Sequence, residues 1–169
     1  MTQKDLDGVT QYLHDHIPLT AHMGVAVVEY DEQSVRLSAP LEPNLNHRDT
    51  AFGGSLSTLG ILAGWTLLHL RLQKAGIANR LVIQKSEMDF KRPAMSSLEA
   101  VCAQTDLAEW DRFKQMIVEK EKSRMTLVSE IFSEGELVAV NEGVFVSLRL
   151  WGASIDLVLQ KRGVRADEL

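Results

Sequence analysis

A polar loop followed by a glycine pair is the place in this sequence where chemistry is best supported. Asn46 and Asp49 precede the pair Gly53-Gly54, and no Lys, Arg, Asp or Glu occurs from Ala51 to Leu70. Backbone N–H groups at the start of a helix are preorganised donors, and the helix dipole favours negative charge there. Glycine lets a substrate approach those N–H groups closely. These residue types suit a site that holds a carbonyl group and stabilises an oxyanion.

The uncharged stretch is predicted to form one long helix over residues 53–75. It is far longer than a strand of ~4–8 residues. Asp49 and Thr50 are capping residue types at its start, and basic residues followed by Gly76 form a stop signal. Because the helix is apolar on every side, we expect it to be buried on every side. Each of its glycines costs ~1 kcal/mol against alanine, so the helix backbone must come close to something.

Two other interpretations of this stretch are open. A run of ~20 apolar residues can span a bilayer, and Gly60-x-x-x-Gly64 resembles a helix-pairing motif. Polar residues within the stretch and the ordinary composition of the remaining chain disfavour that interpretation. The second is a core helix without a function. We favour a helix wrapped by a curved sheet, with a site at its N-terminus.

Length and composition predict one globular domain over residues 1–150 and a C-terminal extension, 151–169, that is partly disordered. The net charge of −5, without a Lys/Arg cluster, disfavours nucleic acid and membranes as partners. Cys102 is the single cysteine, so neither a disulfide within the chain nor a cysteine metal site is possible. We expect no metal and no cofactor. The N-terminus has acidic residues and no apolar signal region, which predicts a cytoplasmic protein.

The remaining patterns predict strands and two amphipathic helices. Asn141-Glu142-Gly143 interrupts the last strand, which indicates a bulge or a bend. Alternation along strand 80–93 points Val82, Gln84 and Ser86 toward the long helix and puts Ile83 on the charged face. Buried polar groups need partners, so Gln84 and Ser86 either bond to backbone or line a site. The predicted elements are helix 3–16, hairpin 22–40, strands 80–93 and 97–105, helix 107–120 and hairpin 124–150.

This order of elements is an α+β architecture in which a curved antiparallel sheet wraps one helix. The stretch from Asn46 to Leu56 is fairly specific, and the strand patterns are not. Further support comes from residues Ala63 to Trp65, Ser86 to Pro93, and Arg124 through Phe145. On these residues, the chain resembles the hotdog-fold thioesterase domain that some bacteria carry fused to an acetyltransferase domain. That family lies in the thioesterase/thiol ester dehydrase-isomerase superfamily, near the phenylacetyl-CoA-type thioesterases. The resemblance covers residues 10–150 and includes nothing of the acetyltransferase half.

The resemblance implies hydrolysis of an acyl-CoA or acyl-carrier-protein thioester by water. It also implies a homodimer or a higher even oligomer, in which strand 81–91 pairs with its twin. The thioester carbonyl would face the N–H groups near Gly53 and Gly54, with the water positioned by Asn46 and Ser86. Basic residues are candidate contacts for the CoA phosphates. The candidate catalytic residues are Asn46, Asp49, Gly54 and Ser86, and the candidate substrate-binding residues are Arg48, Phe52, Gly53, Ser55, Lys91 and Arg92.

The sequence departs from the better-understood relatives at the expected general base. They usually place a carboxylate about two turns into the long helix, where this chain has Ile61, and the next acidic residue is Glu87. Asp49 is the favoured base, although it can equally be an N-cap or an ordinary loop charge. His47 is an alternative base, although an exposed loop histidine without a catalytic role is the stronger interpretation. A catalytically silent acyl-thioester binder or structural dimer module therefore stays open. A hotdog dehydratase needs a His and acid pair, which this region does not clearly offer.

Overall fold

The computed structural model describes residues 1–151 of the chain, which form one sheet and four α-helices. The predicted extension therefore lies, apart from Trp151, outside the described residues. The helices 3–16 and 107–120 are confirmed, and α2 was not predicted. In chain order the elements are α1 (Gln3–His16), α2 (Pro18–His22), β1 (Ala26–Tyr30), β2 (Ser34–Ala39), the 3₁₀ helix η1 (Glu42–Asn44), α3 (Gly53–Lys74), β3 (Asn79–Phe90), β4 (Leu98–Ala103), α4 (Leu107–Lys120), β5 (Lys122–Ser133) and β6 (Glu136–Arg149).

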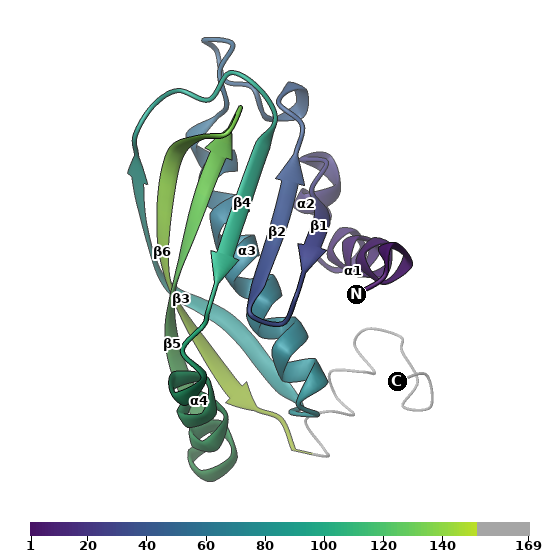
Figure 1. The fold of residues 1–169 in the computed structure, drawn as a ribbon, viewed down its shortest axis with the longest axis vertical. Helices are drawn as coiled ribbons and strands as arrows, with labels where there is room; N and C mark the ends of the chain where they lie inside the picture. The colour runs from purple at the N-terminus through teal and green to yellow at the C-terminus, as the bar shows by residue number, and fades with distance from the viewer. Residues whose placement is uncertain (152–169) are drawn as a thin grey trace.

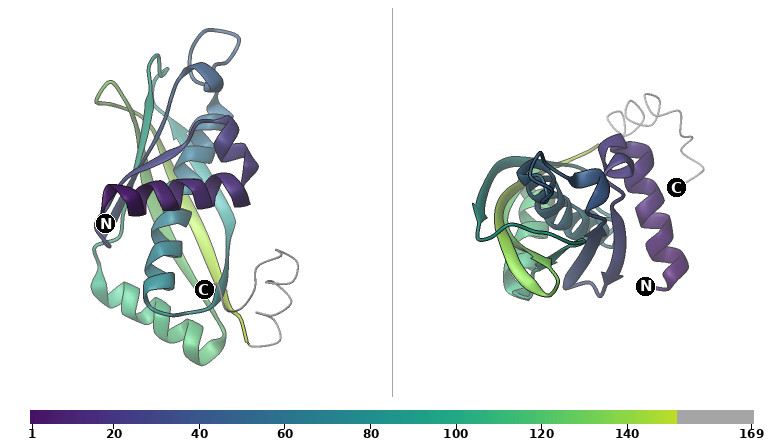
Figure 2. Two further views of the ribbon diagram at one scale, coloured as in Figure 1. Left: turned by 90° about the vertical axis from the view of Figure 1, so that its right-hand side faces the viewer. Right: turned by 90° about the horizontal axis from the view of Figure 1, so that it is seen from above.

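The six strands form one antiparallel sheet in the order β1-β2-β4-β5-β6-β3. The sheet curves around α3, which runs along its concave side (Figure 1). Helix α1 crosses α3 on the side that the sheet leaves open (Figure 2). Strands β1 and β3 are the two edges. The predicted α+β hotdog arrangement is confirmed.

Two helix glycines let α3 lie close to the sheet. A Cβ atom on Gly60 would come within 2.7 Å of the Asn141 Cβ atom on β6. A Cβ atom on Gly64 would come within 2.7 Å of the Phe145 ring, also on β6. Contacts this short do not occur in proteins, so the glycines are required by close packing rather than by helix geometry. The expectation that the helix backbone approaches another element is confirmed.

One stripe of α3 is only half-buried, so the expectation of burial on every side is wrong. Ile61, Trp65 and His69 recur at four-residue spacing along this stripe. The rings of Trp65, His69, Tyr12 and His16 stack in succession, with centroids 4.6, 5.0 and 4.0 Å apart. Helix α1 supplies two of these rings and covers part of the stripe, because a six-stranded sheet wraps only one side of the helix. Within residues 1–151, no helix is long and apolar enough to cross a membrane.

The bulges of the sheet lie elsewhere than predicted. Pairing is regular through Asn141, Glu142 and Gly143, and the extra residues are Val28 in β1, Gln84 in β3 and Val138 in β6.

One extra residue reverses the alternation of a strand. Ile83 therefore packs against the core before the bulge and Met88 packs against it afterwards. Gln84 and Val82 are exposed, so their predicted inward orientation is wrong, as is the assignment of Ile83 to the charged face.

Candidate functional site

The loop between η1 and α3 closes on itself around Asn46. The Asn46 Nδ2 atom donates to Thr50 Oγ1 at 2.9 Å and to the Ala51 carbonyl at 3.2 Å. The Asn46 Oδ1 atom accepts the N–H groups of Arg48 at 2.7 Å and Thr50 at 3.4 Å. Both donors and both acceptor positions of the amide are thereby used. The geometry favours Asn46 as a residue that holds the loop in shape, rather than one that contacts water.

Helix α3 begins at Gly53 without a side-chain cap. Its N-cap residue is Phe52, and no side chain caps the N–H groups of its first turn. The predicted capping by Asp49 or Thr50 is therefore wrong. Asp49 lies in a turn with φ of 58°, and the Thr50 hydroxyl accepts from the Asn46 amide instead. The chain between the loop and the helix is too extended for either side chain to cap the helix.

Two backbone N–H groups remain without acceptors at the helix start. The Phe52 carbonyl accepts the N–H groups of Ser55 at 2.9 Å and Leu56 at 3.1 Å. Among residues 1–151, the N–H groups of Gly53 and Gly54 have no hydrogen-bond acceptor. Unpaired donors at a helix N-terminus carry the positive end of its dipole. This pair is the best-formed anion-stabilising feature of the site.

Two exposed aromatic rings flank the glycine pair. A Cβ atom on Gly53 would lie 3.3 Å from the Phe90 ring, and one on Gly54 would lie 2.3 Å from the Phe52 ring. Phe52 is 56% exposed and Phe90 is 53% exposed. Phe90 comes from the end of β3 and was not among the predicted site residues. The sequence marks Phe90 only as an apolar residue near the end of a strand that Pro93 terminates, which is too general to identify a site residue.

A second polar group lies further along α3, on the sheet side. Asn141 is 1% exposed and donates from Nδ2 to Ser86 Oγ at 2.7 Å and to the Glu87 carbonyl at 3.3 Å. The carbonyl can only accept, so it fixes which amide atom faces β3. Since Ser86 Oγ accepts this bond, its own hydrogen is free to donate, and Ser86 is exposed. Sequence analysis assigned Asn141 to a bulge and missed it as a site residue.

The predicted phosphate contacts are exposed, and two of the three are ion-paired. Lys91 pairs with Asp89 and Arg92 pairs with Glu136. Arg48 Nε donates to His47 Nε2 at 3.3 Å. Exposed ion pairs contribute little and exchange readily with water or ligand.

Helix α3 carries no carboxylate, and Ile61 is half-buried on its open stripe. Asp49 and His47 are both exposed in the loop. In the part of the chain that the structure describes, neither bonds to the glycine pair. No cluster of three or more His, Cys, Asp or Glu that suits a metal ion occurs in that part.

Known proteins are similar to this chain in sequence and fold. Residues 6–149 match the family described as "Putative thioesterase (yiiD_Cterm)". A solved protein of unknown function from Chlorobaculum tepidum is 30% identical, over 86% of this chain and 97% of its own, with a TM-score of 0.80. A protein from Shewanella oneidensis, described as a putative thioesterase, is 27% identical over 87% of this chain and 99% of its own, with a TM-score of 0.75. A Pseudomonas aeruginosa protein described as a probable thioesterase is similar in fold, at 21% identity, 85% and 96% coverage, and a TM-score of 0.73.

Proposed function

Because the chain belongs to this thioesterase family, matched over residues 6–149, we propose that it hydrolyses acyl-CoA or acyl-carrier-protein thioesters at the N-terminus of α3. The observation that carries the proposal is the pair of unpartnered N–H groups of Gly53 and Gly54, which begin a 22-residue helix. Attack on a thioester carbonyl moves negative charge onto its oxygen. Donors fixed in advance at that position stabilise the charge without having to reorganise.

Water is the nucleophile of the proposed reaction. Its oxygen bonds to the carbonyl carbon, the oxyanion forms against the glycine N–H groups, and one water proton passes to the base. Collapse of the oxyanion breaks the C–S bond and releases a carboxylic acid and a thiolate, which takes up a proton. Asp49 is the base that the proposal assigns, at the exposed end of the loop that Asn46 holds.

Ser86 is proposed to hold the attacking water. Its hydroxyl accepts from Asn141 and has its hydrogen free, so it can donate to one lone pair of the water and leave the other for the carbonyl carbon. Asn141 packs against Gly60, six residues beyond Gly54. At 1.5 Å per residue this is about 9 Å along the helix, a span that a carbonyl and one bridging water can fill.

A second copy of the chain is proposed to complete the site. Strand β3 is an edge strand of 12 residues, and an open edge of that length favours pairing. Pairing with its twin across a two-fold axis extends the sheet. The alternating charges of Lys85, Glu87, Asp89 and Lys91 offset one another in such an antiparallel pair. Light scattering at micromolar concentration should give twice the chain mass or a higher even multiple, and a monomer contradicts this arrangement.

A catalytically silent acyl-thioester binder is the second candidate. The specific observation in its favour is Ile61, which stands where better-understood relatives carry a carboxylate on the helix. Release of free thiol from acyl-CoA esters of increasing chain length separates the two candidates. Binding without hydrolysis at every length supports the silent binder.

Gly53→Pro tests the oxyanion site with little effect on the fold. Proline is favoured at the first position of a helix, and the preceding Phe52 already has φ −68° and ψ 132°, as a residue before proline requires. The substitution deletes one N–H group, so turnover should fall ~10²–10³-fold while thermal stability is kept. Gly53→Ala is the matched control, because it adds a Cβ atom and keeps the N–H group. Equal turnover in the two variants excludes this N–H group as a donor.

Two further substitutions separate the loop roles. Asp49→Asn should lower turnover strongly if Asp49 is the base, and Asn46→Ala should lower it by loosening the loop. If Asp49→Asn retains the parent rate, the base is another group. If both variants retain that rate, the loop is not part of the site.

A further inference from the structure

Arg71 is the one buried charged side chain among residues 1–151, and it lies at the opposite end of α3 from the glycine pair. It is 6% exposed. Its Nη1 atom donates to the carbonyl and to the Oε1 atom of Gln104, both at 3.0 Å. Its guanidinium carbon lies 4.1 Å from the centroid of the Trp110 ring. The helix rise places Arg71 about 27 Å from Gly53, well away from the proposed catalytic site.

No carboxylate contacts Arg71 in the described part of the chain. The acidic groups that influence it are engaged with other cations. Glu32 pairs with Lys74, and Asp111 pairs with Lys114 at 2.9 Å. Buried charges in proteins are normally paired, because desolvation of an isolated ion is unfavourable. Burial accordingly lowers the pKa of Arg71 from its ordinary value.

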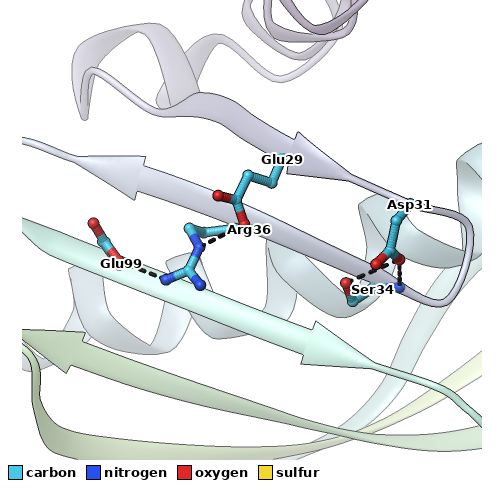
Figure 3. A network of polar contacts seen from close by, with 5 residues as sticks. All are labelled: Glu29, Asp31, Ser34, Arg36 and Glu99. Carbon is cyan, nitrogen blue, oxygen red and sulfur yellow. Dashed lines mark hydrogen bonds and ion pairs between the residues drawn. The ribbon is translucent and has the colours of Figure 1, made fainter. Parts of the chain in front are cut away.

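The carboxylate of the neighbouring Asp31 is also engaged, by hydrogen bonds within the turn between β1 and β2. This carboxylate accepts the N–H of Ser34 at 2.7 Å and the Ser34 hydroxyl at 3.0 Å (Figure 3). It also accepts the N–H of Gln33 at 3.0 Å. These bonds lower the pKa of Asp31, with Ser34 as the largest cause. Asp31 is thus held at the turn and is not a counter-ion for Arg71.

Arg71 opens onto a pocket of about 350 Å³, beside Lys74 and the β1–β2 turn. Both hydrogens of Nη1 are used by Gln104, so the donors of Nε and Nη2 have no protein acceptor among the described residues. Leu107 and Trp110 supply apolar walls. Tyr30 lines the same pocket, and its buried hydroxyl has no partner among these residues.

We propose that this pocket binds a small organic carboxylate. Its two oxygens pair with the Nε and Nη2 edge of Arg71, and its apolar part lies against Trp110 and Leu107. A guanidinium edge matches a planar carboxylate in a two-point contact. Asp31 and Glu32 on the rim outnumber the single Lys74, so a monoanion is favoured over a dianion such as phosphate. The inference does not depend on thioester hydrolysis, because its readout is binding.

Titration of the full ¹⁵N-labelled chain with butyrate tests the proposal. The indole N–H signals of Trp65, Trp110 and Trp151 report three separate places in the chain. The Trp110 signal should shift and saturate while the Trp65 signal stays in place. Absence of a saturable shift up to about 50 mM, which would reveal even a millimolar Kd, overturns the proposal. Tighter binding of inorganic phosphate than of butyrate also overturns it.

Three variants locate the binding. Arg71→Lys keeps the charge but loses the two-point contact, and should weaken butyrate binding at least about tenfold. Arg149→Lys is the matched control, because Arg149 also stacks on a tryptophan, Trp151, at 3.8 Å but lies outside the pocket. Ala75→Leu fills the pocket from its exposed rim without touching the buried Arg71 network. It should abolish the shift even if Arg71→Lys fails to fold, and unchanged binding in Ala75→Leu contradicts the location.

Discussion

Asn141→Asp is expected to reverse the direction in which the Ser86 hydroxyl donates. The parent Nδ2 atom donates to Ser86 Oγ at 2.7 Å, which leaves the hydroxyl hydrogen pointing away from the core. When it is ionised, a carboxyl group of the same size has only acceptors, so the hydroxyl hydrogen turns inward to meet it. The hydrogen bond from Ser86 to the attacking water is then lost. The assay is run at a pH that keeps this carboxyl ionised, because burial raises the pKa of such a group.

The magnitude follows from the bonds that change. Loss of one hydrogen bond to the attacking water is worth about 1 kcal/mol, or about fivefold in kcat/KM, and more if that bond strengthens in the transition state. The new carboxylate also faces the Glu87 carbonyl, which lies 3.3 Å from Asn141 Nδ2 in the parent protein. Asn141 is 1% exposed, so the new group is buried. A buried acceptor placed against an acceptor should lower the free energy of unfolding by about 1–3 kcal/mol. Thiol release and urea unfolding measure the two effects separately.

A double-mutant cycle decides whether Asn141 acts through Ser86. If it does, Asn141→Asp should have little further effect on kcat/KM in a Ser86→Ala background, although it still lowers stability. A merely structural Asn141 would lower kcat/KM by the same factor in both backgrounds. A rise in kcat/KM for Asn141→Asp alone would refute the reasoning, because it would mean that Ser86 works as an acceptor.

Three other outcomes are expected. Phe52→Asp should cap α3 and raise the free energy of unfolding by about 1 kcal/mol. Its carboxylate occupies the glycine N–H groups, so turnover should fall below that of Phe52→Ala. Equal turnover in these two variants contradicts the oxyanion site. Gly60→Ala should destabilise the protein by about 1–3 kcal/mol in urea unfolding, despite the better helix propensity of alanine, because its Cβ atom would lie 2.7 Å from the Asn141 Cβ atom. Gly8→Ala is the control. Its Cβ atom would have nothing within 4 Å, so this variant should be as stable as the parent or more stable. Burial raises the pKa of Cys102 to about 11 from 9.0. The stability that the protonated thiol contributes is therefore complete below pH 9 and is lost as the pH rises toward 11. Cys102→Ala should remove this decrease in the free energy of unfolding between pH 9 and 11.

Local patterns explain why the helices could be predicted closely. Helix α1 has a capping box between Thr2 and Asp5, and the N-cap of α4 is Asp106, whose side chain accepts the Glu109 N–H. These signals lie within four residues of the helix start and need no tertiary information. Both helices were predicted with their observed bounds from the spacing of their apolar residues, which is an equally local signal. The uncharged run likewise identified α3 as the central helix.

The missed features depend on contacts between distant segments. The start of α3 is held by a bond from the Phe52 N–H to the Asn44 carbonyl at 2.7 Å, and Ala51 bonds to Ala94 at 2.8 Å. The sequence near Asp49 carries capping residue types, but these contacts set the loop path and exclude capping. Bulges are likewise a property of strand pairs, so Gln84 could not be recognised from β3 alone. The bond between Asn141 and Ser86 also depends on the pairing of β6 with β3, which the sequence of either strand does not reveal.

The two ends of α3 meet opposite requirements, and this explains its unusual composition. An uncapped start forgoes about 1 kcal/mol of stability, and glycine at positions 53 and 54 lowers helix propensity further. Those losses leave two N–H groups unpaired, which the proposed oxyanion site requires, and a conflict of this kind between stability and function is common. The far end instead anchors the helix, through the contacts of Arg71 with Gln104 and Trp110. A helix fixed firmly at its C-terminal end and along the sheet can leave its first turn unsatisfied without fraying, which is the condition for preorganised donors.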